Sequence, residues 1–527
     1  MEKEQIDEFI IGLKLKDKIE ARPYQVEIAA NVLSKGNSLV VMPTALGKSY
    51  VALLITAEKA VNGGRVLFLA PTRPLVNQHF KLVSEILPYT SSIITGEIPA
   101  GSRVYSTQII FATPQVVRND LKSGRVDINS FSLIVFDEVH RAIGDYAYSF
   151  IAEKAKNTRA LLVGFTASPS SERRKIEEIC SKLGIENIDI RTESDEEVRE
   201  YVNEIETEWE FIPLPEWLKK LDDEIKIIFQ KVCDPLGLKN PSKRQLLAIR
   251  GAAISHLHHN PHGFKTLTTV ARAINVLHAG ELLETQGLKT TLDFFNGLGE
   301  KKSKAARDLL KDDDFSKIIS EVDLLIKEGK EHPKFEKLME LVKEEISKKH
   351  SLIIFAQYRS TVKQIVALLE AGGVEAKQLI GRSNAGMKQK EQVDLIREFK
   401  NGEFSVLVCT SIGEEGLSIA EVDMVIFFEA VPSEIRLIQR RGRTGRVRAG
   451  RMVALVSKNT RDEAYFWASR NKEKKMQRLL LRMKKKKEVE PSEPRVQPQE
   501  IKAKSVKVEK PESGKFEKKK VSLTDWT

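Results

Sequence analysis

Two kinds of hydrophobic pattern alternate along this chain of 527 residues. Short uninterrupted apolar runs, such as 131–136 and 404–409, are typical of strands that are buried on both faces. Longer stretches such as Tyr50 to Ala60 carry apolar residues at helical spacing. The alternation predicts α/β architecture with parallel sheets, because parallel strands need a crossover connection that is usually a helix. The expected strands lie at 38–41, 65–70, 93–94, 109–112, 131–136, 161–165, 351–355, 404–409 and 422–428.

The same patterns divide the chain into four regions. A strand at 206–214 is followed by helical periodicity from Pro215 to about Lys330, and a second α/β pattern begins there. Beyond Lys484, Pro, Glu, Lys, Ser and Val dominate without periodicity, so 488–520 is expected to be disordered. The expected fold is two parallel-sheet α/β domains at 1–203 and 331–475, an all-α insertion at 204–330, and a disordered basic tail at 476–527.

The first apolar strand leads into a loop that ends in Gly47-Lys48-Ser49, just before a helical stretch. Backbone N–H groups at a helix start, together with the helix dipole, suit a bound phosphate. We expect Thr44 and Gly47 to line this loop, Lys48 to reach the β- and γ-phosphates of a nucleotide, and the Ser49 hydroxyl to bind Mg²⁺. Met42 stands where such loops usually have their first glycine, so the interpretation depends on the motifs that follow.

Upstream of this loop, Arg22-Pro23-Tyr24-Gln25 opens a helical pattern. The amide of Gln25 offers one donor and one acceptor, which suits the edge of an adenine base. Arg22 and Gln25 are therefore candidate nucleotide-binding residues, and a position on the surface of a helix is the alternative.

Two acidic residues follow the buried strand at 131–136. We expect Asp137 to hold Mg²⁺, and Glu138 to orient and deprotonate an attacking water. Near the other end of the chain, Gln439-Arg440-Arg441-Gly442-Arg443-Thr444-Gly445-Arg446 concentrates guanidinium groups on a glycine-containing turn. Such groups suit a γ-phosphate, as arginine fingers supplied by the same chain.

Several strands end in loops of small and hydroxyl-bearing residues, where an α/β domain usually binds its ligand. Hydroxyl and N–H groups in such loops suit phosphodiester contacts, whereas helix capping is the alternative for any single loop. The candidate contacts are Thr72, Arg73, Thr95, Gly96, Thr113, Pro114, Gln357, Arg359, Thr410 and Ser411. Thr166-Ala167-Ser168 is a further polar strand end.

Charge and composition add information about partners. The net charge is +11, but residues 472–527 hold 18 Lys and Arg against 9 Asp and Glu, a net of +9, which leaves +2 for the rest. A basic tail suits nucleic acid, and a solvated end is the alternative. Three distant cysteines favour a reducing compartment. The absence of long apolar runs and of a signal-like start predicts a cytoplasmic, nucleoid-associated protein without a membrane span.

Taken in order, these motifs resemble those of superfamily 2 helicases, and most closely the archaeal Hef / Fanconi anaemia M-type DNA translocases. The resemblance covers about residues 20–475. It rests on the segments 22–25, 47–49, 71–75, 112–115, 137–140, 166–168, 386–392, 414–417 and 439–446. The resemblance to this particular subfamily rests on the helical insertion, on Leu282-Leu283-Glu284-Thr285-Gln286-Gly287, and on Arg461-Asp462-Glu463-Ala464-Tyr465.

The resemblance implies two RecA-like domains with ATP and Mg²⁺ in the cleft between them. It implies that Arg443 and Arg446 reach across from the second domain and that Gln439 helps to position the γ-phosphate and water. It also implies that Thr166 and Ser168 couple hydrolysis to movement, and that a thumb-like insertion grips duplex or branched DNA. The nuclease that many archaeal relatives carry has no counterpart in this sequence, so a separately encoded nuclease is an expected partner.

Three functions remain open. The first is an ATP-driven helicase or translocase on forks, Holliday junctions or single strands, in replication-fork repair and recombination. The others are an RNA-directed ATPase of the Dicer or innate-sensor kind, and a non-catalytic nucleotide-dependent scaffold. The C-terminal Leu523 and Trp526, three residues apart in a polar tail, resemble a sliding-clamp-binding peptide. Packing of this apolar pair against the protein body is the alternative.

Overall fold

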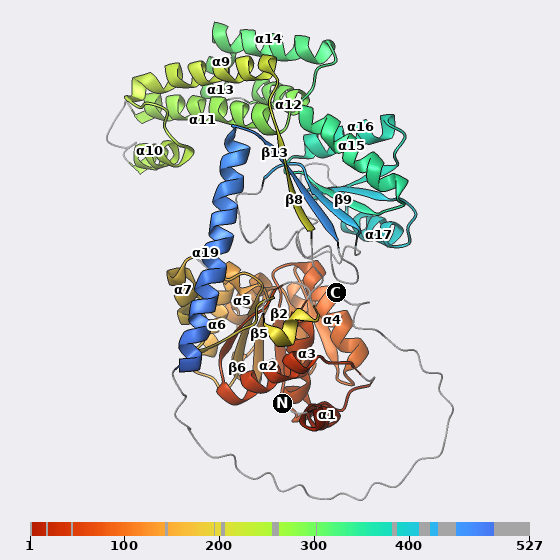
Figure 1. Ribbon diagram of the computed structural model, residues 1–527. Helices are drawn as coiled ribbons and strands as arrows, with labels where there is room; N and C mark the ends of the chain where they lie inside the picture. The colour runs from red at the N-terminus through yellow and green to blue at the C-terminus, as the bar shows by residue number, and fades with distance from the viewer. Residues whose placement is uncertain are drawn as a thin grey trace, which may run out of the picture. The chain divides into compact units, whose positions relative to one another are not determined.

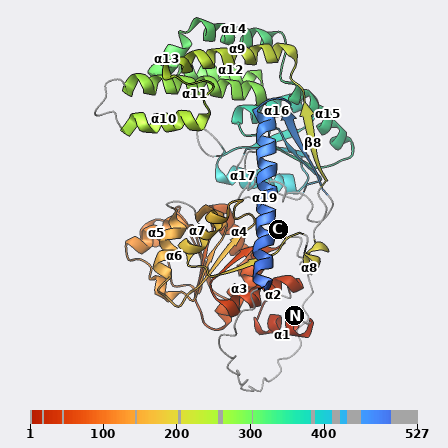
Figure 2. The same ribbon diagram turned by 60° about the vertical axis from the view of Figure 1, so that its left-hand side comes forward.

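The computed structural model describes residues 3–16, 19–43, 46–142, 146–193, 195–201, 206–255, 263–301, 303–381, 387–410, 422–430 and 450–489. The chain divides into two compact units. The first comprises residues up to 202 together with those from 472 onward, and the second comprises residues 203–471. Each unit has a parallel sheet of its own, and the two sheets can be followed in Figure 1 and, after a rotation, in Figure 2.

The first unit is built on seven described strands in the order β3-β4-β2-β5-β6-β1-β7, all of them parallel to their neighbours. The central strands are apolar and fully buried because helices cover both faces of the sheet. The strands are β1 (Ser38–Val41), β2 (Val66–Leu69), β3 (Ser91–Ile94), β4 (Ile109–Ala112), β5 (Leu133–Phe136), β6 (Leu161–Thr166) and β7 (Asn187–Ile190).

One face of this sheet packs on the amphipathic helices α1 to α4, whose apolar side chains form a single core with alternate residues of the strands. Helices α5, α6 and α7 lie on the other side of the sheet (Figure 1). The helices are α1 (Lys3–Gly12), α2 (Pro23–Lys35), α3 (Lys48–Val61), α4 (Arg73–Ile86), α5 (Pro114–Lys122), α6 (Ala147–Ala155), α7 (Arg173–Leu183) and α8 (Glu196–Arg199), with short 3₁₀ turns at Ala100–Ser102, Ile128–Ser130 and Val139–Ala142.

The second unit has six described strands in the order β10-β11-β9-β12-β13-β8, again all parallel. The strands are β8 (Glu206–Ile212), β9 (Leu352–Phe355), β10 (Ala376–Leu379), β11 (Val406–Cys409), β12 (Met424–Phe427) and β13 (Arg451–Ser457). The helices that accompany this sheet are α15 (Pro333–Ser347), α16 (Arg359–Ala371), α17 (Gln389–Lys400) and the start of α19 (Arg461–Val489).

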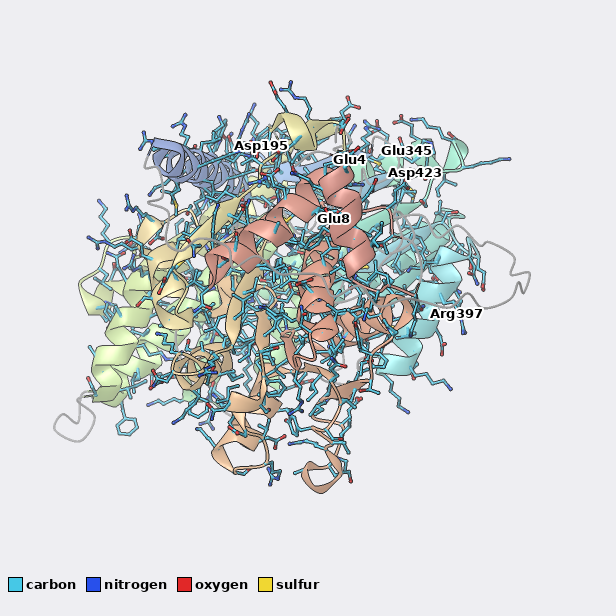
Figure 3. All side chains as sticks on the ribbon, turned by 90° about the horizontal axis from the view of Figure 1, so that it is seen from below. Glu4, Glu8, Asp195, Glu345, Arg397 and Asp423 are labelled. Carbon is cyan, nitrogen blue, oxygen red and sulfur yellow. The ribbon has the colours of Figure 1, made fainter. Side chains whose placement is uncertain are left out.

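Polar contacts fix the start of strand β9 between its neighbours. Asp423 accepts hydrogen bonds from the backbone N–H and the hydroxyl of Ser351, at 2.9 and 3.0 Å. Glu345 of α15 lies 2.6 Å from His350 Nδ1 and accepts from Arg451 at 3.1 Å. Asp423 therefore joins the start of β12 to the start of β9, and Glu345 joins α15 to the start of β13; both residues are labelled in Figure 3.

A helical layer of the second unit has a core separate from that of the sheet, formed by residues such as Leu221, Val276, Phe295 and Phe315. It can be seen as a group of helices in Figure 1. It consists of α9 (Glu216–Cys233), α10 (Lys243–Ser255), α11 (Gly263–Thr285), α12 (Leu288–Gly299), α13 (Lys304–Leu310) and α14 (Asp313–Lys327), with a 3₁₀ turn at Asp234–Leu236. None of the described helices is long and apolar enough to cross a bilayer.

The structure differs from the sequence-based expectation in the position of one strand, in the end of one helix and in three strands that were not expected. Strand β8, expected within the all-α insertion at 204–330, pairs with β13 along its whole length and so extends the second sheet. Helix α19 continues to Val489, past the expected boundary at 475, and its residues from 472 onward belong to the first unit. Strands β7, β10 and β13 were not predicted from the sequence. The expected tail from 490 onward lies outside the described residues.

Candidate nucleotide and nucleic-acid site

The strand order of the first sheet brings the predicted phosphate loop and the acidic pair to one edge. Strand β1 ends at the phosphate loop, β5 ends at Asp137, and β6 lies between them and ends at Thr166. Because these neighbouring strands are parallel, their carboxyl ends meet at the same edge of the sheet. The strand order therefore brings the phosphate loop, the acidic pair and Thr166 together, although they are far apart in the sequence.

Helix α3 begins at Lys48, and Gly47 precedes it in a left-handed conformation with φ 77°. A Cβ atom at Gly47 would lie 2.4 Å from Gln25 Nε2, so a glycine is required both by the backbone conformation and by close packing. Lys48 Nζ donates to the carbonyl oxygens of Met42 and Pro43, both at 3.2 Å. The ammonium group is thus bound to backbone carbonyls at the start of the phosphate loop. Thr44 lies outside the described residues.

Asp137 is buried at the end of β5, and its Oδ2 lies 3.0 Å from His79 Nε2 of helix α4. The His79 ring is also buried, its centroid lies 4.4 Å from that of the Phe68 ring at a tilt of 33°, and its Nδ1 has no hydrogen-bond partner among the described residues. Tyr148 of α6 donates to the Asp137 carbonyl at 2.6 Å. The aspartate is therefore fixed by side chains on both faces of the sheet, and sequence reasoning found neither of these two residues.

Glu138 has φ 51°, a left-handed conformation that is uncommon for a residue other than glycine. Burial raises the pKa of this carboxyl, but the hydrogen bond and charge of His140 and the charges of Lys48 and Arg141 outweigh burial. The net pKa is lowered from 4.5 to about 2. His140 Nδ1 lies 3.3 Å from Glu138 Oε2. The carboxylate is therefore ionised at neutral pH and can accept a hydrogen bond from water.

The same His140 Nδ1 lies 3.3 Å from Thr166 Oγ1, which also accepts from the backbone N–H of Ser168 at 3.2 Å. The hydroxyl of Ser168 is buried and has no hydrogen-bond partner among the described residues. The acidic pair and the polar end of β6 are thus joined through one imidazole. The predicted coupling residues Thr166 and Ser168 lie at the site, although their coupling role stays a prediction.

Gln25 is completely buried at the start of α2. Its Oε1 accepts from Arg22 N at 3.1 Å, and its Nε2 donates to Leu46 O at 3.0 Å. The hydroxyl of Tyr24 donates to the same carbonyl at 2.9 Å and accepts from Arg22 Nη1 at 3.0 Å. Both ends of the amide therefore bind backbone groups, and a direct contact with adenine would require one of these bonds to open.

The predicted nucleic-acid contacts of the first unit follow the three strands on the other half of the sheet, in the order β3-β4-β2. Arg73 Nη1 forms an ion pair with Glu97, which joins the loop after β2 to the loop after β3. Thr72 begins α4, and its hydroxyl is buried without a hydrogen-bond partner among the described residues. Thr95, Gly96, Thr113 and Pro114 belong to the same row of loops.

In the second unit, Gln357 and Arg359 follow β9, and Thr410 follows the neighbouring strand β11. Arg359 Nη2 donates to Gly381 O at 2.6 Å, and Thr410 N donates to Leu379 O at 3.1 Å. These candidates therefore share one edge as well. Besides Thr44, the candidate residues that lie outside the described part of the chain are Ser411, Gln439, Arg443, Arg446, Leu523 and Trp526.

The residues at the first site are suitable for Mg²⁺. The donors are oxygens, from the Asp137 carboxylate and the half-buried Ser49 hydroxyl, and Mg²⁺ in nucleotide sites takes one or two carboxylates together with water and phosphate oxygens. The described residues contain no group of three or more His, Cys, Asp or Glu side chains that could hold a metal without such help. Asp137 and Ser49 would therefore bind the ion together with the phosphates.

Comparison with known proteins agrees with this arrangement. Residues 18–171 match the family described as "Type III restriction enzyme, res subunit", and residues 333–448 match the "Helicase conserved C-terminal domain". The crystal structure of the Pyrococcus furiosus Hef helicase domain is 40% identical in sequence, covers 85% of this chain and 98% of its own, and has a TM-score of 0.64.

Two curated relatives are longer than this chain. A Methanocaldococcus jannaschii protein, provisionally named an ATP-dependent RNA helicase, is 40% identical over 484 residues, which cover 88% of this chain and 61% of the relative. The ATP-dependent DNA helicase mph1 of Neurospora crassa is 32% identical over 511 residues, which cover 87% of this chain and 43% of the relative. The chain thus spans about half the length of these proteins.

The chain belongs to the superfamily 2 helicases, in the group that contains the Hef helicase domain. This confirms both the family predicted from the motifs and the prediction of two parallel-sheet domains.

Proposed function

We propose that the protein is an ATP-hydrolysing DNA helicase or translocase that acts on forked or branched DNA. The observation that carries the proposal is the assembly of Lys48, Asp137 and Glu138 at one edge of the first sheet, where β1 and β5 end on either side of β6. Each unit also has a row of polar loops at the carboxyl ends of its own strands. The Lys48 charge also contributes to the lowered pKa of Glu138, which supports a single site formed by the phosphate loop and the acidic pair. The DNA helicase mph1 among the relatives supports DNA as the substrate.

In the proposed reaction, the N-terminus of α3 and Lys48 bind the β- and γ-phosphates, and Lys48 leaves its two carbonyl partners to do so. Glu138 orients the attacking water and accepts its proton. Mg²⁺, bound by Asp137 and Ser49 with the phosphates, would supply charge stabilisation of the transition state. Gln439, Arg443 and Arg446 would complete the site, and removal of either arginine should lower turnover by about 10³-fold or more.

The loops that begin α4 and α5, and that follow β3, β9 and β11, would bind the phosphate backbone. Binding to phosphates carries little sequence information, so sequence preference should be weak and affinity should fall steeply with salt. The helical layer α9–α14 would contribute the preference for branched DNA, because it contains none of the nucleotide-site motifs.

The test is a comparison of ATPase rates with single-stranded DNA, a fork, a four-way junction and duplex RNA at equal nucleotide concentration. We expect the fork or the junction to stimulate most, and we expect Lys48→Ala to abolish turnover in every arm while it leaves DNA binding largely intact. An unchanged rate in Lys48→Ala would contradict the catalytic assignment.

An RNA-directed ATPase is the second candidate, favoured by the provisional name of the M. jannaschii relative. Stimulation by duplex RNA alone would establish it in place of the DNA proposal. A non-catalytic scaffold would bind ATP and DNA without turnover, so the same assay distinguishes all three functions.

The C-terminal segment supports a further proposal about partners. Leu523 and Trp526, three residues apart, would lie on one side of a 3₁₀ turn and dock a sliding clamp. Calorimetry of a 515–527 peptide against the clamp of the host, with Trp526→Ala as the control, tests this directly. The absence of heat for the unaltered peptide would leave the basic tail as a nucleic-acid arm. We also propose a separately encoded nuclease partner and a location at the nucleoid.

A further inference from the structure

The segment Leu282-Leu283-Glu284-Thr285-Gln286-Gly287 lies where the helical layer joins the sheet of the second unit. Helix α11 ends at Thr285, and α12 begins at Leu288 after Gly287, which has φ 101°. A Cβ atom at Gly287 would lie 2.4 Å from Glu331 Oε1, which itself accepts from Leu288 N at 2.7 Å. The sharp turn and its cap thus explain the glycine, but they do not explain Gln286.

Gln286 is 1% exposed, and both ends of its amide are used. Its Nε2 donates to Glu429 Oε2 at 3.3 Å, and its Oε1 accepts from Thr361 Oγ1 at 2.8 Å. Since the Thr361 proton is used in this bond, the 3.2 Å contact between Thr361 Oγ1 and Thr290 Oγ1 requires Thr290 to donate. One buried amide therefore connects α12, α16 and the end of β12.

Two of the elements that meet at Gln286, helix α16 and the end of β12, are close in sequence to proposed functional residues. Thr361 stands two residues after Arg359, in the first turn of the helix whose preceding loop is a proposed DNA contact. Glu429 follows β12 and stands ten residues before Gln439, the first residue of the arginine motif. The third element, the helical layer, is the proposed reader of branched DNA.

Neighbouring contacts hold the end of α11 firmly against the rest of the unit. His332 Nε2 lies 3.0 Å from Glu284 O, and Lys334 Nζ donates to Thr285 O at 3.3 Å and binds Asp462. Asp462 in turn accepts from Ala430 N at 2.8 Å, next to Glu429. A shift of the helical layer would therefore be transmitted to residues 429 and 430, because the polar groups between them are buried and paired.

We propose that Gln286 is a positioning residue that couples DNA bound by the helical layer and the α16 loop to ATP turnover. The inference rests on the proposed function, because it assigns a role in regulating that same nucleotide site. This role predicts that loss of the amide lowers the stimulation of the ATPase by DNA but leaves DNA binding unchanged. Loss of a residue needed only for folding would not affect the two readouts differently.

The test is Gln286→Met, which keeps an unbranched side chain of similar length and removes the hydrogen bonds of the amide to Thr285, Thr361 and Glu429. Basal ATPase, maximal fork-stimulated ATPase, the half-saturating fork concentration and the thermal midpoint are measured together in the full chain. We expect the maximal stimulation to fall by about 10-fold, within the range of roughly 2- to 30-fold typical of residues along a coupling network. The basal rate and the half-saturating fork concentration should stay within about twofold.

Thr291→Val is the matched control. Thr291 is also fully buried and donates to Gly287 O at 2.7 Å, but it has no bond to Thr361 or Glu429. Its variant should lose stability without losing stimulation. Thr361→Val should lower the maximal stimulation as well, and the double variant should be no worse than Gln286→Met, because both single variants remove the Thr361–Gln286 hydrogen bond.

The outcomes separate the two proposals. Full stimulation in Gln286→Met, or an equal loss in Thr291→Val, would overturn the coupling role while the DNA-stimulated ATPase of the unaltered protein stands. If no nucleic acid stimulates the unaltered protein, the proposed function fails, and the coupling role fails with it. If Gln286→Met does not fold, Thr361→Val decides the question, because it preserves side-chain volume.

Discussion

Gln25 Nε2 donates to Leu46 O at 3.0 Å, so the glutamine expected to recognise adenine is bonded to the backbone of the phosphate loop. Its other end accepts from the backbone N–H of Arg22, and Arg22 lies over the Tyr201 ring at 4.6 Å from the centroid. Gln25 therefore connects the start of α2 to the residue before Gly47. Any contact with a base would be linked to the conformation of the phosphate loop.

Gln25→Glu should weaken ATP binding even if the base is never touched. The carboxylate can still accept from Arg22 N but cannot donate to Leu46 O, and a buried carboxylate would then face a carbonyl oxygen. We expect the KM for ATP to rise by about tenfold or more, with a stability cost of about 1–3 kcal/mol. Steady-state ATPase and thermal unfolding measure the two effects.

Glu27→Gln is the control for this change. Glu27 lies two residues further along the same helix, half-exposed, in an ion pair with Arg191 at 3.3 Å. Arg191 keeps its ion pair with Asp189 at 2.6 Å when the bond to Glu27 is lost, so both readouts should stay close to those of the unaltered protein. Equal KM values for Gln25→Glu and Glu27→Gln would show that the loop does not depend on Gln25.

Glu138→Gln should retain ATP binding and lose turnover. The amide has nearly the same size but cannot accept a proton from water, so a loss of at least about 100-fold is expected for a missing general base. Rapid-quench measurement of a single turnover, beside equilibrium nucleotide binding, separates the two effects. Glu153→Gln, at an exposed position of α6, serves as the control. Normal turnover in Glu138→Gln would mean that another group is the base.

Much of this site could be predicted because its signals are local in the sequence. The strand 133–136 and its two acids are consecutive, as are the phosphate loop and the helix that follows it. His79 could not be predicted, since it meets Asp137 across 58 residues and on a different element. The edge strands β7 and β10 were missed because half-exposed polar residues such as Asp189 and Lys377 interrupt their apolar pattern. Strand β13 is an apolar run that the same reasoning could have found.

Asp120 is a buried centre of charge beside the proposed nucleic-acid loops. It accepts from Arg103 Nη1 at 2.8 Å, Arg125 Nη1 at 2.9 Å and the Tyr105 hydroxyl at 2.8 Å. Arg103 Nε also donates to Ile98 O at 3.0 Å. The aspartate therefore holds, through Arg103, the loop that contains Thr95 and Gly96.

Asp120→Asn should weaken DNA binding without changing basal ATP hydrolysis, because the neutral amide holds Arg103 less firmly. We expect a several-fold rise in the dissociation constant for labelled single-stranded DNA, measured by anisotropy, and a stability loss of about 1–3 kcal/mol. Asp127→Asn is the control, since Asp127 caps an exposed turn in the same segment, with its Oδ1 accepting from Asn129 N at 3.0 Å. Equal DNA affinity in the two variants would mean that the Arg103 contact does not position the loop.

His332 gives a prediction about pH. Burial, with a contribution from the Lys334 charge, lowers its pKa from 6.5 to about 3, although its contact with Glu284 O opposes the shift. Between these two pH values the unfolded chain binds a proton that the folded protein does not, so the folded state loses stability as pH falls through this window. From this group alone, lowering the pH from 7 to 5 should reduce the free energy of unfolding by about 2 kcal/mol.

The total pH dependence cannot isolate this effect, because Glu284 acts in the opposite direction. Burial and the neighbouring Asp222 raise the pKa of Glu284 to about 7, so protonation of its carboxyl favours the folded state between pH 4.5 and 7. The measurement is therefore a difference between His332→Gln and the unaltered protein, each studied by urea unfolding at pH 7 and pH 5. The unaltered protein should lose about 2 kcal/mol more than the variant over this interval. His350→Gln, at a histidine whose side chain is 40% exposed in the same unit, controls for loss of an imidazole. Identical pH dependence in His332→Gln and the unaltered protein would mean that His332 is protonated in the folded state.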